Sequence, residues 1–202
     1  MNLNWAQAAL DVIIFWMLTT PHEFAHAWVA EKLGDPTPRA EGRVTLNPLA
    51  HVDWMGTVIL PALTSLFAGG FLGWGRPVNT NVARLRGHYN GLVLVALAGP
   101  ASNIVFALIL AVIGQFWTDG AEILFRAAYL SIYLALFNLL PVPPLDGSKF
   151  LLAARIPPKI YIEIARFGFL VILIAIFSTG LGRWMSQASF VTALKMFTFF
   201  RG

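Results

Sequence analysis

The sequence predicts an all-α polytopic membrane protein, and three observations support that fold class. Hydrophobic residues make up 57% of the 202 residues and charged residues only 12%, whereas soluble domains carry roughly a quarter charged residues. Apolar runs of about 18 residues or more alternate with short polar segments, which leaves no room for a soluble core. The 14 Lys and Arg residues cluster between those runs, as orientation signals do, and form no basic patch typical of nucleic-acid binding. We therefore expect one integral-membrane domain over residues 1–202, with a lipid bilayer as its surroundings.

Three apolar runs are expected to form the transmembrane core. The first, residues 5–33, is long enough as a helix to cross a bilayer and emerge. Pro21 removes one helical hydrogen bond within it, which predicts a local kink. The next two spans are expected at residues 89–117 and 121–140, so the three-span core would occupy about residues 5–150.

Two less regular segments separate the first and second spans. The sequence Arg43-Val44-Thr45-Leu46 alternates polar and apolar residues, as a short strand at the membrane surface would. Residues 55–72 are apolar but contain Pro61, Gly69 and Gly70, which disfavour a simple span. We expect this second segment to be re-entrant, entering the membrane and returning on the same side.

One or two helices are expected after the core, over about residues 159–200. Residues 160–181 form a fourth apolar run. In the tail, Phe190, Leu194 and Phe197 recur at helical spacing, so residues 184–200 are expected to form either an interfacial helix or a weak span.

The pentapeptide His22-Glu23-Phe24-Ala25-His26 carries the predicted chemistry. On a helix, residues 22 and 26 lie on one face, where two neutral imidazoles can share a Zn²⁺ ion. Glu23 lies beside them, where its carboxylate can take a proton from water. Thr20 to Glu23 also fits a capping box, but that would not explain two histidines. Because the chain contains no cysteine, any zinc must be held by His and carboxylate ligands.

A catalytic zinc usually has three protein ligands, so a third must come from elsewhere. Asp146 follows a proline-rich break after the third span, and an ionisable residue at membrane depth suggests a functional role. The pair Asp146-Gly147 fits equally well a turn outside the membrane. Other candidates are Glu31, Glu41, His51 and His88. Both histidines in that set lie in charged interfacial stretches, where we expect them to be solvated.

Three motifs, in this order, resemble those of the site-2 protease family of intramembrane zinc metalloproteases. Residues 22–26 resemble the HExxH motif, residues 99–103 the GPxxN element, and residues 138–147 the NxxPxPxxDG element. Ala25 replaces the glycine that is common in the family before the second histidine. No stretch resembles a PDZ or CBS domain, so the resemblance is to the minimal members.

The resemblance implies a complete active site. One Zn²⁺ would be bound by His22, His26 and Asp146, and Glu23 would be the general acid and base. Asn103 and Asn138 would lie nearby, where their amides could hold an unwound substrate segment or a developing oxyanion. Interhelical hydrogen bonding is the alternative role for both amides.

The expected function is hydrolysis of peptide bonds in or near transmembrane segments of membrane-protein substrates. A strand at residues 43–47 could pair with the unwound substrate. One alternative is a membrane-anchored zinc peptidase acting on soluble peptides, with a ligand such as Glu31 and no need for Asp146. Another is a non-enzymatic metal transporter, which would not need Glu23 as a base.

The membrane topology follows from placing His22 and Asp146 at one depth. The first and third spans must then be parallel, which is why residues 55–72 should not cross. All Lys and Arg residues would then lie on one side except Arg126, Arg183, Lys195 and Arg201. By the positive-inside rule that side is cytoplasmic, so the N-terminus lies outside and the active site lies nearer the cytosol. The expected location is the cell membrane of a prokaryote.

Overall fold

The computed structural model describes residues 4–67 and 72–199, and within those ranges it contains helices but no strand. The long helices are α1 (Trp5–Lys32), α4 (Tyr89–Phe116), α5 (Ala121–Asn138), α7 (Pro158–Ser178) and α8 (Leu181–Phe199). The short helices are α2 (Thr37–Ala40), η1 (Pro48–Ala50), η2 (Trp54–Ile59), α3 (Leu60–Phe67), η3 (Val82–Arg84), η4 (Asp146–Ser148) and α6 (Lys149–Ala153). The expected all-α fold class is confirmed, with helix boundaries within three residues of those expected for every span.

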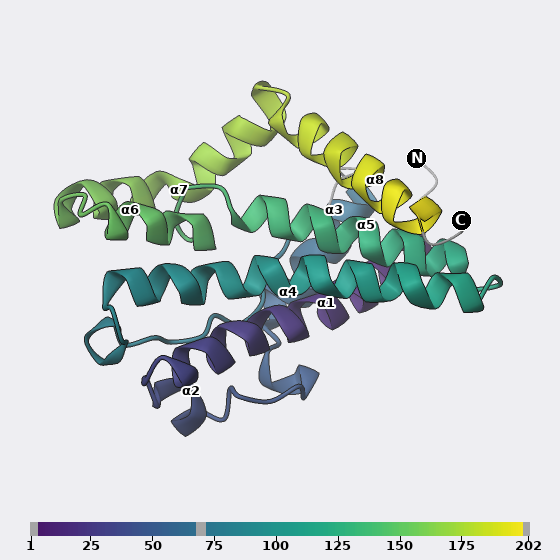
Figure 1. Ribbon diagram of the computed structural model, residues 1–202. Coiled ribbons are helices and arrows are strands. Elements are labelled where there is room, and N and C mark those ends of the chain that lie inside the picture. Colours follow the sequence, from purple (N-terminus) through teal and green to yellow (C-terminus); the bar gives the residue numbers. More distant parts are fainter. Residues whose placement is uncertain (1–3, 68–71, 200–202) are drawn as a thin grey trace.

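Helices α1, α4 and α5 form the core of the molecule (Figure 1). Arg126 of α5 forms an ion pair with Asp11 near the start of α1, at 2.6 Å. Leu134, two turns further along α5, packs beside Leu18, further along α1. The two helices therefore run in the same direction, as a shared site for His22 and Asp146 requires.

Helix α8 packs against α4 and α5 through a stripe of residues four apart. Met185, Ser189, Ala193 and Phe197 are its buried residues, and small side chains in such a stripe let helices approach closely. Phe190 is 50% exposed. Of the apolar residues that recur in this tail, Phe197 is therefore buried in the packed face, whereas Phe190 is not.

Three of the described helices are long and apolar enough to cross a membrane: α4, α5 and α7. Helix α7 is the least covered of them, with Gly168 and Ile172 as its buried residues. Helix α1 is as long as α4 but carries polar side chains, and those of Asp11, Thr19 and Thr20 are buried against the rest of the protein. Its polar residues thus face the protein interior.

The segment after residue 53 reverses its direction, as a re-entrant segment would. Helices η2 and α3 form its first part, and the chain from residue 72 returns to contact both. A π-helical turn, η2, precedes Pro61, whose missing N–H and ring demand a wider turn than the α-helix offers. On the return, the Leu72 N–H donates to Thr64 Oγ1 at 3.1 Å, and the Trp74 N–H donates to the Gly56 carbonyl at 3.0 Å. The expectation for Gly69 and Gly70 falls outside the described residues.

The strand expected at residues 43–47 is wrong, because residues 44 and 45 form a bend and the others are irregular chain. The prediction rested on the alternation of polar and apolar residues, and burial does not follow that alternation. Arg43 is instead 3% exposed and Leu46 is 62% exposed. The Arg43 guanidinium donates to the carbonyl oxygens of Ala50 and Arg76, so it holds two loops together from the inside.

Two further local expectations are also wrong. His51 is fully buried, and its Nε2 lies 2.7 Å from the Thr45 carbonyl, so it braces the loop rather than facing solvent. Helix α1 begins at the Asn4 cap and continues through Pro21. Thr20 is therefore inside the helix, where its hydroxyl donates to the Trp16 carbonyl at 3.0 Å.

Candidate metal centre and active site

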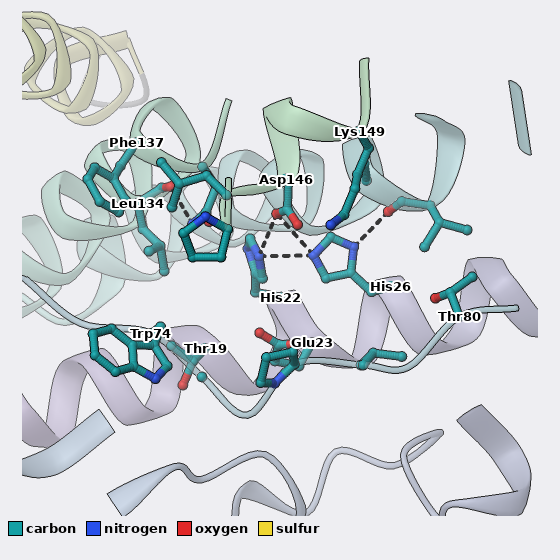
Figure 2. Close-up of a pocket in the computed structure, with 18 of the residues that line it drawn as sticks. Thr19, His22, Glu23, His26, Trp74, Thr80, Leu134, Phe137, Asp146 and Lys149 are labelled. Carbon is teal, nitrogen blue, oxygen red and sulfur yellow. Dashed lines mark hydrogen bonds and ion pairs between the residues drawn. The ribbon is translucent and has the colours of Figure 1, made fainter. Parts of the chain in front are cut away.

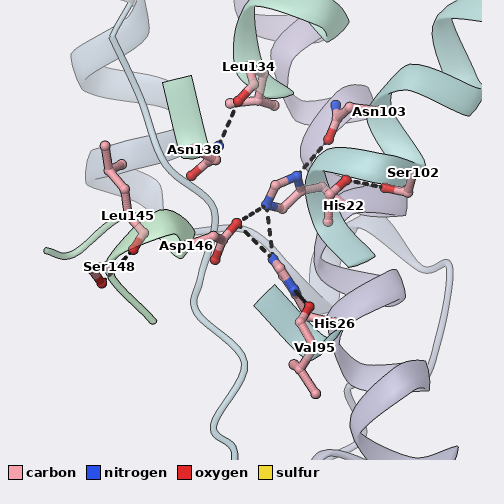
Figure 3. Close-up of polar contacts among 11 residues, drawn as sticks. His22, His26, Val95, Ser102, Asn103, Leu134, Asn138, Leu145, Asp146 and Ser148 are labelled. Atoms are coloured by element: carbon pink, nitrogen blue, oxygen red, sulfur yellow. Dashed lines mark hydrogen bonds and ion pairs between the residues drawn. The ribbon is translucent and has the colours of Figure 1, made fainter. Parts of the chain in front are cut away.

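The structure brings together His22, His26 and Asp146, which are far apart in the sequence (Figure 3). The two histidine Nε2 atoms lie 3.1 Å apart. Asp146 Oδ2 lies 3.1 Å from the Nε2 atom of His22 and 3.1 Å from that of His26. Three donor atoms thus form a nearly equilateral triangle at the centre of the helical core.

The tautomer of each histidine follows from its second nitrogen. His22 Nδ1 lies 2.6 Å from Asn103 Oδ1, and His26 Nδ1 lies 2.6 Å from the Val95 carbonyl oxygen. Both partners only accept hydrogen bonds, so each Nδ1 carries the proton and each Nε2 of a neutral ring presents a lone pair. Two nitrogen lone pairs and a carboxylate oxygen converge on one point, an arrangement that a cation stabilises.

The amide of Asn103 is held in that orientation by a residue that the sequence motifs do not include. Asn103 Nδ2 donates to the Ser131 hydroxyl at 3.2 Å, and this hydroxyl donates to the backbone carbonyl oxygen of Asn103 at 2.8 Å. Both side chains are fully buried. Helices α4 and α5 therefore fix the ring plane of His22 on α1. The Asn103 amide lies behind His22 and is not part of the cavity lining.

Two glycines allow the close approach of backbone that the triangle needs. A Cβ atom on Gly99 of α4 would lie 2.4 Å from His26 Nε2 and 2.6 Å from His22 Nε2. A Cβ atom on Gly147 would lie 2.2 Å from the Leu139 carbonyl oxygen. Gly99 thus leaves space next to the two histidine rings. Gly147 lets the loop after α5 fold back so that Asp146 reaches the histidines.

Zinc fits this donor set. At zinc–ligand distances near 2.0–2.1 Å, neighbouring donors of a tetrahedral site lie about 3.3 Å apart, close to the 3.1 Å separations of the three atoms. Two imidazoles and one carboxylate are also a common ligand set of catalytic zinc. No competing acidic residue joins them in the described chain, because Glu31 pairs with Arg39 and Glu41 accepts from Asn79.

A cavity of about 810 Å³ adjoins the triangle, and Glu23 and Asn138 line it together with the histidines and Asp146 (Figure 2). Glu23 is 8% exposed. Asn138 donates to the Leu134 carbonyl of its own helix at 3.0 Å. Apolar side chains of α5 and α7 form much of the remaining wall, so the cavity combines a polar centre with an apolar surface.

The extended chain at residues 72–81 forms the wall opposite Asp146 (Figures 2 and 3). A Cβ atom on Gly75 would lie 3.0 Å from Glu23 Oε1, so the backbone passes directly against the carboxylate. The Arg76 N–H donates to the His51 carbonyl at 2.9 Å. The wall is therefore anchored to the buried loop around residue 51.

Two buried loop residues, Asp35 and His51, hold the wall formed by residues 72–81 in place. The Asn81 N–H donates to Asp35 Oδ2 at 2.6 Å, and the Thr37 N–H donates to Asp35 Oδ1 at 3.1 Å. Burial raises the pKa of Asp35, but these hydrogen bonds outweigh it and hold the pKa below its ordinary value. Burial lowers the pKa of His51, so this ring stays neutral.

Comparison with known proteins agrees with this site. The model of "Peptidase family M50" matches residues 116–176. "Putative zinc metalloprotease YwhC" of Bacillus subtilis is 35% identical over 198 residues, covering 89% of this chain and 86% of that protein. "Putative zinc metalloprotease Rip2" of Mycolicibacterium smegmatis is 31% identical over 195 residues, covering 92% and 73%. "Zinc metalloprotease MJ0392" of Methanocaldococcus jannaschii is 23% identical over 156 residues, covering 76% and 36%. No solved structure matches the chain at a significant level.

Apolar helices long enough to cross a bilayer, together with this similarity, define an integral-membrane zinc metalloprotease. The chain belongs to peptidase family M50, the site-2 proteases, and its cofactor is zinc.

Proposed function

We propose that the protein is an intramembrane protease that hydrolyses peptide bonds in or near transmembrane segments of other membrane proteins. The observation that carries the proposal is the triangle of His22 Nε2, His26 Nε2 and Asp146 Oδ2. It lies beside Glu23 in a cavity whose lining includes residues of α4, α5 and α7, the helices of membrane-spanning length and composition. A membrane-anchored peptidase for soluble peptides would not need Asp146 at the histidines, and a metal transporter would not need Glu23 beside the triangle.

His22, His26 and Asp146 are the proposed zinc ligands, and Asn103 is the proposed positioning residue for His22. Zinc bound there supplies a Lewis acid that polarises the scissile carbonyl and makes water acidic near neutral pH. Glu23 takes the proton of the attacking water and delivers it to the nitrogen of the leaving amine. Asn138, on the cavity wall, offers its amide to the substrate backbone.

The rest of the cavity suits an apolar substrate in extended form. Backbone amides of a transmembrane helix are hidden in hydrogen bonds, so the helix must unwind before water can attack. Leu134, Phe137 and Phe169 line the cavity and offer apolar surface to the side chains of such a segment. A peptidase for soluble peptides is less well supported, because Glu31 pairs with Arg39 instead of joining the histidines.

Cleavage in proteoliposomes tests the proposal. The purified protein is co-reconstituted with a single-span substrate, and the products are located by mass spectrometry. The wild type should cut within or beside the span, and Glu23→Gln should lose roughly 10²–10⁴-fold in rate because the general base is gone. Glu31→Gln on the same helix is the matched control and should retain activity. Cleavage of soluble peptides with none of the embedded substrate would instead favour the membrane-anchored peptidase.

We also propose that the N-terminus lies outside the cell membrane of a prokaryote and that the site lies towards the cytoplasm. The relatives above are bacterial and archaeal, and the basic loops favour this orientation. The backbone N–H groups of Thr37 and Asn81 both donate to the Asp35 carboxylate. This supports placing both residues on the same side of the membrane. Single cysteines at Thr37 and Thr80 should be labelled by an impermeant reagent from the cytoplasmic face, and one at Thr118 from the outer face. Opposite labelling of positions 37 and 80 would refute the re-entrant topology.

A further inference from the structure

Lys149 is a charged group of the cavity that the proposed mechanism does not use. It is the first residue of α6 and is half-buried in the cavity wall. Figure 2 shows its side chain pointing into the cavity, on the same side as His26. Among the described residues that line the cavity it is the only Lys or Arg. Within residues 4–67 and 72–199, its ammonium group has no acidic partner at ion-pair distance.

The charges of the proposed site cancel without Lys149. A divalent zinc would be balanced by the carboxylates of Asp146 and Glu23, and the two histidines would be neutral ligands, because zinc would take the place of a proton on each Nε2 while Nδ1 keeps its own. Hydrolysis of a neutral peptide only moves protons between water, Glu23 and the leaving amine. Lys149 therefore adds one positive charge that no step of the reaction compensates, and an uncompensated charge beside apolar walls is unfavourable.

The position of Lys149 indicates where a compensating anion would lie. Along the cavity, Trp74, Leu134 and Phe137 lie towards the His22 end, whereas Thr80 and Lys149 lie towards the His26 end (Figure 2). The His26 end is also the end of α1 that leads to Lys32 and the basic loops. A substrate segment would thus meet apolar side chains along the cavity and a cation at the His26 end.

We propose that Lys149 forms a carboxylate-binding subsite that selects substrates with Asp or Glu next to their apolar segment, a few residues from the scissile bond on the His26 side. This subsite rests on the proposed function and narrows its substrate class. A carboxylate there forms a charge-assisted hydrogen bond with the ammonium group. Lys149 would then act on substrate choice and not on zinc binding.

A charge-swap experiment tests the subsite. One single-span substrate that the wild type cleaves is prepared with Glu, Gln or Lys at each of four positions on the presumed His26 side of the cut. The wild type should cleave the best Glu member at least roughly 10-fold faster, by kcat/KM, than its Lys counterpart. Lys149→Glu should reverse that order, and Lys149→Arg should preserve it. Lys159→Glu, a matched charge reversal at an exposed residue outside the cavity, should leave it unchanged.

Zinc content is measured for every variant and should match the wild type, which separates a subsite from a damaged metal centre. An unchanged substrate order in Lys149→Glu, or an equal loss of rate on all members in both Lys149→Glu and Lys149→Arg, would overturn the subsite. A wild type that cuts Glu and Lys members equally would refute the subsite alone. A wild type that cuts no embedded substrate would refute the proposed function and the subsite together.

Discussion

Helix α1 buries polar side chains while helix α7 exposes apolar ones, although both are long enough to cross a bilayer. On α1, the buried set includes Asp11, His22, Glu23 and His26. On α7, only Gly168 and Ile172 are buried, and large side chains such as Phe167 and Leu170 are more than half exposed. Exposed apolar surface of this kind suits lipid contact, so the chemistry is confined to the core while α7 forms its outer wall.

This contrast also separates rigid from adaptable parts of the cavity. The histidines of α1 are fixed by α4, through the Val95 carbonyl and Asn103, and by the loop that carries Asp146. Helix α7 contributes only Phe169 and Ile172 to the cavity lining. Substitutions in the core should therefore alter the metal centre, and substitutions on α7 should not.

Among substitutions of residues other than the proposed ligands and Glu23, the largest effect is expected from Gly99→Ala. The added methyl group would lie 2.4 Å and 2.6 Å from the two Nε2 atoms, so the rings or α4 must move. Such a displacement should lower the cleavage rate by about 10²-fold or more and reduce bound zinc. Elemental analysis and cleavage assays on the same preparation measure both effects.

Gly114→Ala is the matched control for that substitution, because it lies on the same helix and its Cβ would meet Phe197 of α8 at 2.6 Å. It should perturb packing but keep zinc. Normal zinc and normal activity in Gly99→Ala would show that the site does not depend on close approach of α4.

A smaller effect is expected from the residues that orient His22. Asn103→Ala removes the acceptor for His22 Nδ1 and should weaken zinc binding about 10–100-fold. Ser131→Ala should weaken it less, since it only releases the Asn103 amide. Competition with a chelator of known affinity measures both. Ser189→Ala, at an equally buried serine on α8, should have no effect, and a zinc loss there would argue against a specific network.

The sequence is informative about this site where the chemistry is local. His22 and His26 are one helical turn apart, so their shared face follows from periodicity alone. Asp146 is 120 residues beyond His26, and from the residues alone it could equally have been a turn. Only its resemblance to a family motif selected it, and the structure then places it against the histidines.

Other parts of the site depend on packing that no local pattern encodes. The Val95 carbonyl supports His26 through a backbone atom that every residue has. Nothing in the sequence distinguishes Ser131 from the other serines, because its role depends on α5 packing against Asn103 of α4. The error at Arg43 has the same origin, since its burial depends on carbonyls from a loop more than 30 residues away. One feature of the sequence could have predicted part of this packing. Small residues recur on α4 and α8 at the positions where these helices pack closely.

The smallest effects on the metal centre are expected on α7. Ile172 is 3% exposed and packs beside Phe137, Leu145 and Met185. Ile172→Ala should lower the free energy of unfolding by about 2 kcal/mol through the cavity it leaves. Leu170→Ala, at a side chain 53% exposed, should change it by less than about 0.5 kcal/mol. Thermal unfolding in detergent compares them, and both should retain zinc. Zinc loss in Leu170→Ala would place α7 within the metal centre and erase the contrast with α1.

The most direct measurement of the central claim is zinc content per chain in four purified proteins: wild type, Glu23→Gln, Glu31→Ala and Asp146→Ala. His22, His26 and Asp146 are the proposed ligands, and Glu23 and Glu31 are not. The wild type, Glu23→Gln and Glu31→Ala should each carry about one zinc, and Asp146→Ala should lose it. Full zinc in Asp146→Ala, or its loss in Glu31→Ala, would contradict the assignment of the third ligand and with it the intramembrane site.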